Sequence, residues 1–165
     1  MNTCPRIAVV GTGPVGRALA AAYVSGGGQV AVIVSRDASR AAAAAPRVGA
    51  TRGSADLTEV LAADVVLVCV PDRVLAEVAA GLAALPAATA PLLVHTSGAL
   101  PAAVLAACGR RAASLHPLQS FPDLADDAAL ASRVAGTHFF HEGDDAERCA
   151  ELTAVWRGTL HRLAR

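Results

Sequence analysis

The sequence predicts an α/β domain built on a doubly wound, mostly parallel sheet. Short and fully apolar runs, such as 64–70 (DVVLVCV), alternate along the chain with alanine-rich segments of helical spacing. Strands that are apolar on both faces are typical of parallel sheets with helices on both sides. The chain has 165 residues, about the length of one domain, so we expect a single domain over 1–165.

The first half of the chain predicts four strands, at 6–10, 29–34 and 64–70 and, more briefly, at 48–51. The segments around them have helical spacing and predict helices at 17–25, 38–45, 56–63 and 71–85. Pro46 is expected to stop the second helix, because proline lacks the backbone N–H that a helix interior needs. Pro71, in contrast, suits the first turn of a helix.

The second half repeats this pattern. Strands are expected at 92–95, 112–115 and 136–140, with the start of a last strand at 159–163. Helices are expected between them at 101–108, 123–132 and 144–156. This alternation supports a sheet that is wound in both directions from its first strand.

Charge and hydropathy exclude several classes of function. The chain has 14 basic and 14 acidic residues, and all 14 basic residues are arginine. Because nucleic-acid-binding proteins usually carry a basic excess, we expect no nucleic-acid partner. The absence of lysine excludes a Schiff base or a P-loop lysine. No apolar stretch reaches the ~20 residues that span a bilayer, and no signal-peptide pattern precedes the first strand, so we expect a cytoplasmic protein without a membrane partner.

The cysteines and most histidines show no metal-binding spacing. None of the cysteines forms a CxxC pair, and we expect all four to be buried and reduced: Cys4, Cys69, Cys108 and Cys149. We expect His95 to point into the sheet or its loop. The remaining histidines outside the polar stretches are expected at the surface: His138, His141 and His161. The sequence therefore predicts no metal site.

A glycine-rich turn lies between the first expected strand and the first expected helix. Its sequence, GTGPVG at 11–16, has the G-x-G-x-x-G spacing of dinucleotide-binding sites. Gly11 permits a tight turn, Gly13 lets the backbone approach a pyrophosphate, and Gly16 lets the helix pack against the strand. N–H groups at the helix start then hold the anion. We therefore expect a Rossmann-like sheet whose cofactor contacts Gly11, Thr12, Gly13, Pro14, Val15 and Gly16; the alternative is a glycine turn without a ligand.

The end of the second strand predicts which dinucleotide binds. NAD sites usually present an acidic residue there, about 20 residues beyond the glycine motif. This chain has Ser35 and Arg36 instead, with Arg40 one helical turn further. A hydroxyl and a guanidinium suit the 2′-phosphate of NADP, which an acidic side chain would repel. We therefore expect NADP as the cofactor; the alternative is a solvated Arg36 that binds nothing.

Ligands of open α/β sheets bind outside the carboxyl ends of the strands. For this reason we expect Val70 and Pro71, at the end of strand 64–70, to contact the cofactor. Two polar stretches stand at the ends of the next two strands, VHTSGA at 94–99 and SLHPLQSFP at 114–122. Both would lie beside the nicotinamide, in a chain that is otherwise poor in polar residues.

The succession VVGTGPVG, VSR, VCVPD, HTSGAL and SLHPLQSFP resembles a bacterial family of oxidoreductases with no established substrate. That family pairs a Rossmann-like NADP domain with a helical carboxyl-terminal domain. It is more distantly similar to the superfamily of 6-phosphogluconate dehydrogenase, pyrroline-5-carboxylate reductase and deazaflavin-dependent NADP reductase. The resemblance implies that the helical domain is absent from this chain, which ends at Arg165. In the superfamily those helices complete the substrate pocket and form the dimer, so a homodimer is expected mainly when they are present.

A partial resemblance to prephenate and arogenate dehydrogenases implies roles for two side chains. Those enzymes also have a serine after strand five and a His-Pro after strand six. Ser97 and His116 match that pair, although the lysine near that family's serine has no counterpart here. By this resemblance His116 would be the general acid or base and Ser97 would hydrogen-bond the substrate. Gln119, in the second polar stretch, is a further candidate that would help to orient the substrate. The alternatives are structural: a strand cap, a turn serine, and a glutamine that orients its own loop.

The sequence as a whole favours an NADP-dependent oxidoreductase, or the nucleotide-binding domain of one, that transfers a hydride to or from an unknown small molecule. One alternative is a non-catalytic NADPH-binding sensor or regulatory module. Another is a Rossmann domain for a sugar nucleotide or S-adenosylmethionine. Ser35 and Arg36 speak against S-adenosylmethionine, which usually needs an acidic residue at that place.

Overall fold

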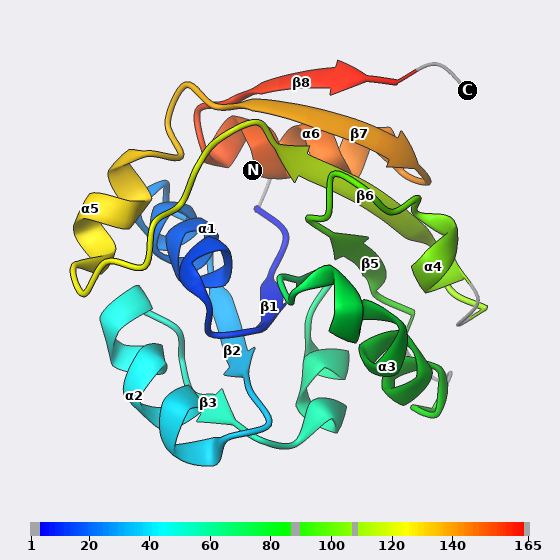
Figure 1. The fold of residues 1–165 in the computed structure, drawn as a ribbon, viewed down its shortest axis with the longest axis horizontal. Coiled ribbons are helices and arrows are strands. Elements are labelled where there is room, and N and C mark those ends of the chain that lie inside the picture. Colours follow the sequence, from blue (N-terminus) through cyan, green and yellow to red (C-terminus); the bar gives the residue numbers. More distant parts are fainter. Residues whose placement is uncertain (1–3, 87–89, 107–108, 164–165) are drawn as a thin grey trace.

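The computed structural model describes residues 4–86, 90–106 and 109–163. Within these ranges, eight strands form one sheet in the order β3-β2-β1-β4-β5-β6-β7-β8 (Figure 1). The strands are β1 (Ile7–Val10), β2 (Val30–Val34), β3 (Gly53–Ser54), β4 (Val65–Val68), β5 (Leu92–His95), β6 (Ala112–Pro117), β7 (His138–Gly143) and β8 (Thr159–Arg162). All neighbouring strands run parallel except β6 and β7, so the predicted α/β fold with a mostly parallel, doubly wound sheet is confirmed.

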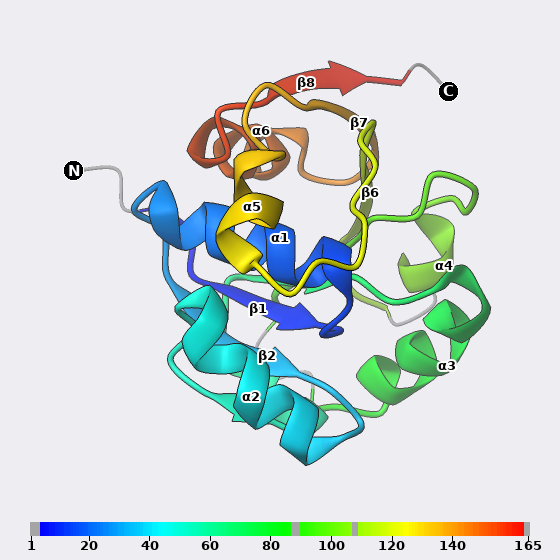
Figure 2. The same cartoon turned by 60° about the vertical axis from the view of Figure 1, so that its left-hand side comes forward.

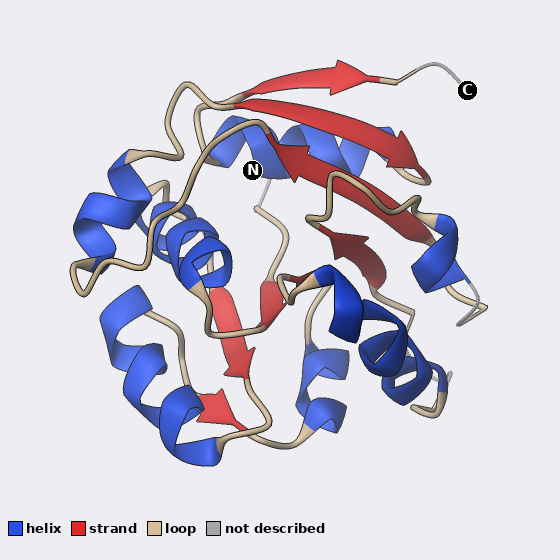
Figure 3. Cartoon of the chain, viewed as in Figure 1, coloured by secondary structure: helices blue, strands red, loops and turns tan. Residues whose placement is uncertain are grey.

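Helices cover both faces of this sheet (Figure 3). They are α1 (Pro14–Ser25), α2 (Ala38–Val48), α3 (Asp72–Ala83), α4 (Ala103–Ala106), α5 (Asp127–Ser132) and α6 (Ala146–Val155), with a 3₁₀-helix η1 at Leu57–Ala62. Alternate residues of β1 enter two separate cores. Ile7 and Val9 pack with α1, α2, α5 and α6, whereas Ala8 and Val10 pack with η1, α3 and α4. Figure 2 shows α5 lying against α1.

Aromatic side chains concentrate in the core beneath α1 and α6. Trp156, directly after α6, stacks on Phe139 with ring centroids 5.2 Å apart. The ring centroids of Trp156 and Tyr23 are 5.9 Å apart, in an edge-to-face arrangement. Its indole Nε1 donates a hydrogen bond to the carbonyl of Leu19. These contacts fasten the strands at one end of the sheet to the helix that follows β1.

The sheet changes direction between β1 and β4. The chain moves from β1 through β2 to β3 on one side, then returns to β4 and continues outward through β5 to β6. Such a reversal leaves a crevice at the carboxyl ends of the two central strands, which is where open α/β sheets bind ligands. The glycine-rich turn follows β1 at this crevice.

Two predicted elements around Pro46 are wrong. Helix α2 does not stop at Pro46 but runs to Val48, and the predicted strand at 48–51 is replaced by the helix end. Pro46 lies in the last turn, so its missing N–H removes only one hydrogen bond of the helix. Gly49, with a left-handed φ of 71°, ends α2 by donating its N–H to Ala45. The third strand forms instead at Gly53–Ser54.

Two further boundaries bear on the site. Helix α1 begins at Pro14 rather than Arg17, which brings the glycine motif to the helix terminus itself. Strand β6 continues to Pro117 rather than ending at Leu115, because its antiparallel pairing with β7 extends to Pro117 and Phe139. His116 therefore lies within β6 and not in the loop after it.

No helix in the described part of the chain combines the length and the apolar character that crossing a membrane requires.

Candidate functional site

The glycine-rich turn is shaped by two close approaches. Gly11 has φ +114°, a conformation that side chains rarely adopt, and a Cβ at this position would collide with the carbonyl of Cys69 at the end of β4. A Cβ on Gly16 would collide with the carbonyl oxygen of Gly11. Both glycines are therefore required by packing alone, since they allow β1, β4 and α1 to meet at one point.

Gly13 differs from these two, because no packing contact demands it. A Cβ built on Gly13 meets no heavy atom within 4 Å, and its φ of −73° and ψ of 175° suit any residue. Gly13 is also the N-cap of α1, so no side chain caps the free N–H groups of the first turn. The open space beside Gly13 thus lies at the positive end of a 12-residue helix, which is the environment that an anionic phosphate needs.

A cavity of about 460 Å³ opens beside this turn. Its walls come from the glycine turn at 11–13, the end of β2 at 34–36, the end of β4 at 69–71, and the apolar side chains Val74 and Val78 of α3. Three chain segments that are far apart in sequence thus meet at the crevice between β1 and β4. A cavity of this size, apolar with a few polar groups at one end, is typical of a small-molecule or cofactor site.

Most of the predicted cofactor-binding residues line this cavity: Gly11, Thr12, Gly13, Ser35, Arg36, Arg40, Val70 and Pro71. Pro14 lines a neighbouring cavity, to which Thr12, Gly13 and Arg40 also contribute. Val15 and Gly16 line neither of these two, because Val15 packs on the core and Gly16 lies against Gly11. The structure therefore brings together the groups expected to meet a phosphate and a ribose.

The polar end of the cavity is built by β2 and the first turn of α2. Asp37 is the N-cap of α2 and accepts hydrogen bonds from the N–H groups of Ser39 and Arg40. Its carboxylate is therefore engaged by the helix start. The Arg40 Nε lies 3.7 Å from Asp37, and the exposed Arg36 guanidinium lies 3.5 Å from Glu77 on α3. Two arginines thus border the space where the sequence predicts the 2′-phosphate.

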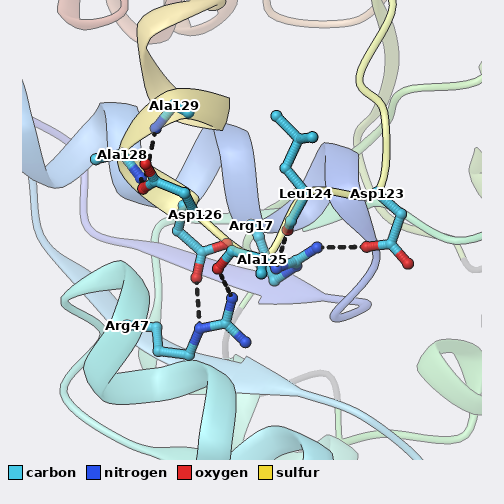
Figure 4. A network of polar contacts seen from close by, with 9 residues as sticks. Arg17, Arg47, Asp123, Leu124, Ala125, Asp126, Ala128 and Ala129 are labelled. Atoms are coloured by element: carbon cyan, nitrogen blue, oxygen red, sulfur yellow. Dashed lines mark hydrogen bonds and ion pairs between the residues drawn. The ribbon is translucent and has the colours of Figure 1, made fainter.

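A buried ionic network, which the sequence did not indicate, lies next to the glycine turn (Figure 4). Arg17 of α1 is almost fully buried, and its guanidinium lies 2.7 Å from both Asp123 and Asp127. Arg47 of α2 lies 2.8 Å from Asp127 and donates to the carbonyl of Ala125. The network attaches the loop before α5 to α1 and α2. Its signal in the sequence is an arginine inside an otherwise apolar helix, but the acidic partners lie more than a hundred residues away.

His116 lies near the carboxyl end of β6 and is itself half-buried, whereas the other residues of the strand are buried. Its Nδ1 is 3.1 Å from the carbonyl oxygen of Thr96, and the ring packs against Gly98, where a Cβ would come within 2.7 Å of Nε2. In the sheet it stands opposite Phe140 of β7, whose ring stacks on His161. His116 does not line the cavity beside the glycine turn, but Thr96 links the two places, because its N–H donates a hydrogen bond to the carbonyl of Val68, next to Cys69 of the cavity wall.

Ser97 and Gln119 make contacts with their own loops. The Ser97 hydroxyl oxygen accepts hydrogen bonds from the N–H groups of Ala99 and Leu100. Gln119 is exposed, accepts from the N–H of Ser120, and donates to the carbonyl of Arg133 at 3.4 Å. Ser97 therefore lies in the loop that carries Gly98, next to His116, whereas the Gln119 side chain is held by the loop that follows β6.

The other histidines and the cysteines correct two expectations. His95 is buried as expected: its Nε2 donates to the carbonyl of Pro101, and burial lowers its pKa. His141 is buried rather than at the surface, because it faces the core under α6 and bonds the carbonyl of Asp144. Cys4 is exposed rather than buried, and Cys108 lies outside the described residues. No group of three or more metal-ligating side chains occurs within residues 4–86, 90–106 and 109–163.

Comparison with known proteins gives one family and a set of similar structures. The family described as NADP oxidoreductase, coenzyme F420-dependent, matches residues 6–97, more than half of the chain. No curated protein matches the chain in sequence. A protein from Bacteroides fragilis assigned as an NADP oxidoreductase is 24% identical, with a TM-score of 0.76 over 96% of this chain and 60% of that chain.

Two further structures share the fold at lower identity. Arogenate dehydrogenase from Synechocystis is 19% identical, with a TM-score of 0.79 over 96% of this chain and 59% of that chain. Pyrroline-5-carboxylate reductase from Coxiella burnetii is 16% identical, with a TM-score of 0.74 over 99% of this chain and 60% of that chain. The present chain thus spans about three fifths of the length of these structures.

Proposed function

Because the chain belongs to the family of coenzyme F420-dependent NADP oxidoreductases, we propose that residues 1–165 are the NADP-binding domain of an oxidoreductase acting on a small molecule. The observation that carries this proposal is the open space at Gly13. Gly11 and Gly16 are explained by packing, whereas Gly13 leaves room at a helix N-terminus where a phosphate would fit.

The residues around the cavity fit the parts of a dinucleotide. The N–H groups of the first turn of α1 and the backbone at 11–13 would hold the pyrophosphate. Val74 and Val78 offer an apolar wall for the adenine ring. Val70 and Pro71, at the end of β4, would support the part of the cofactor that continues toward β5.

The polar end of the cavity supports NADP over NAD. Ser35, Arg36 and Arg40 supply one hydroxyl and two guanidinium groups. Asp37, which follows Arg36, is not among the residues that line the cavity, and its Oδ1 is engaged by the start of α2. A charge-assisted hydrogen bond to phosphate contributes about 1.5–3 kcal/mol, which corresponds to one to two decades in affinity.

When bound, a nicotinamide cofactor supplies or accepts a hydride, and the protein positions it and handles one proton. His116 is the candidate for that proton. A carbonyl oxygen can only accept a hydrogen bond, so the contact with Thr96 requires the proton of neutral His116 to sit on Nδ1. Nε2 is then the basic atom, ready to accept a proton from an alcohol or, once protonated, to donate one. Ser97, with its hydroxyl hydrogen still available, would hold the substrate oxygen or nitrogen.

A homodimer stays a proposal here, and so does the identity of the substrate. In the structural relatives the present chain matches only about three fifths of the length, so the rest of those proteins can contribute to a substrate pocket. We therefore expect this chain to bind NADPH but to turn over substrates slowly by itself, because an open site leaves water around the nicotinamide.

The decisive experiment uses Gly13→Thr. Threonine and glycine are similar as N-cap residues, and the space beside Gly13 is empty, so the variant should melt close to the parent protein. Its side chain would fill the phosphate position, and NADPH binding measured by calorimetry should fall at least tenfold. Ala154→Thr is the control, at an exposed position of α6 outside both cavities, and it should leave NADPH affinity unchanged. Unchanged NADPH affinity in Gly13→Thr would contradict the proposed site.

A further inference from the structure

An acidic side chain lies beside one of the arginines at the predicted phosphate position. Glu77, on α3, lies 3.5 Å from the guanidinium of Arg36, which follows β2. Both residues line the same cavity. The ion pair therefore connects two separate segments of the chain at the wall of the predicted adenine and ribose site.

The ion pair between Arg36 and Glu77 is weak enough for a ligand to displace it. The side chains of Arg36 and Glu77 are 83% and 66% exposed, and the separation of 3.5 Å is longer than a normal charge-assisted hydrogen bond. Exposed ion pairs of this kind are weak, since water screens them and both side chains lose freedom in forming them. A phosphate dianion, with several acceptor oxygens, can displace Glu77 from the guanidinium.

After that displacement the carboxylate remains fixed to α3, close to the incoming negative charge. Like charges a few ångströms apart near a protein surface repel each other appreciably. A cofactor without the 2′-phosphate brings no such charge, and it leaves Arg36 free to stay paired with Glu77. The same carboxylate thus acts differently on the two dinucleotides.

We propose that Glu77 is a specificity-determining residue that competes with the 2′-phosphate for Arg36 and so weakens the preference for NADPH over NADH. The inference rests on the proposed function, because it needs a dinucleotide in this cavity. It adds a residue that the glycine motif and the end of β2 do not reveal.

The test is the ratio of NADPH to NADH dissociation constants in Glu77→Gln, measured by calorimetry at low salt. Removing an exposed counter-charge should tighten NADPH binding by about two- to fivefold and leave NADH binding within error. The gain should shrink at high salt, where exposed charges are screened. In an Arg36→Ala background the same substitution should change the ratio less, since the competition for Arg36 is gone and only the direct repulsion between Glu77 and the phosphate remains.

Glu151→Gln is the matched control, because Glu151 forms an exposed ion pair with Arg148 on α6, outside the cavity. It should leave both affinities unchanged. An equal change for both dinucleotides in Glu77→Gln, or no change, would overturn the inference while the proposed function stands. If the parent protein binds neither dinucleotide, the proposed function fails, and the role of Glu77 falls with it.

Discussion

The Nδ1 atom of His116 lies 3.1 Å from the carbonyl oxygen of Thr96, and this contact selects one neutral form of the imidazole. The proton must sit on Nδ1, which leaves Nε2 as the acceptor beside Gly98. We predict that nitrogen NMR shows His116 as the Nδ1–H tautomer at high pH. A dominant Nε2–H form would contradict both the contact and the proton-transfer role proposed for Nε2.

The close packing of Gly98 on the same ring leads to a second prediction. A methyl group at this position would come within 2.7 Å of His116 Nε2, so Gly98→Ala should displace the imidazole. We expect its nitrogen resonances to shift and NADPH binding to stay unchanged.

Where a substrate is turned over, His116→Ala should lose about 10²-fold or more in rate, because positioned acid–base groups contribute about 10²–10⁴-fold. An unchanged rate would leave His116 as a structural residue.

The two aspartates on Arg17 should contribute unequally to stability. Both lie 2.7 Å from its guanidinium, but the side chain of Asp127 is 5% exposed and that of Asp123 is 84% exposed. Removing one partner of a buried ion pair costs about 3–5 kcal/mol, whereas an exposed pair contributes about 0–1 kcal/mol. We predict that Asp127→Ala lowers the free energy of unfolding several-fold more than Asp123→Ala, as measured by urea denaturation followed by circular dichroism. Similar losses for the two variants would show that burial does not decide the outcome.

Buried His95 should make the fold more sensitive to mild acid. Burial lowers its pKa below the ordinary value, so the unfolded chain binds a proton more readily than the folded chain. The contribution of His95 to the free energy of unfolding is therefore fully present above a pH of about 6.5. It decreases as the pH falls below that value, by at most about 1.4 kcal/mol per pH unit. We predict that the loss of stability between pH 7 and pH 5.5 is smaller in His95→Gln than in the parent, each compared with its own value at pH 7. Parallel pH profiles would contradict this assignment.

The cysteine thiols should differ in reactivity according to their exposure. Burial raises the pKa of Cys69 and of Cys149 to about 12, so neither forms the reactive thiolate at neutral pH, whereas Cys4 is exposed. We predict that iodoacetamide modifies Cys4 in the native protein and reaches Cys69 and Cys149 only in urea, as shown by peptide mass spectrometry. Rapid native modification of Cys69 would indicate that the wall of the cavity opens.

The sequence was sufficient to predict those elements that depend on residues close together in the chain. The apolar runs identified seven of the strands, and the glycine spacing placed the turn at the crevice, because both depend on residues that are close together in the chain. The extent of β6 was underestimated, since it is set by pairing with β7, about twenty residues away. The length of α2 was underestimated because the rule for proline does not hold for a last turn.

Contacts between distant segments escaped prediction for the same reason. Arg17 is an ordinary helical arginine in the sequence, and only the packing of α5 on α1 brings Asp127 to it. Glu77 lies on α3, and only the folded chain brings it next to Arg36 at the cavity. The roles predicted for His116, Ser97 and Gln119 stay predictions, although the first two now lie in one place and Gln119 is held by its own loop.

Trp156 gives the molecule an intrinsic optical reporter. It is the single tryptophan of the chain, it is buried, and it is stacked on Phe139 with Tyr23 at its edge. Its fluorescence in the native state should be that of an indole shielded from water, and the nearby tyrosine should transfer excitation to it. Because Trp156 does not line the cavity at the glycine turn, the wavelength of its emission should follow the integrity of the core between α1 and α6.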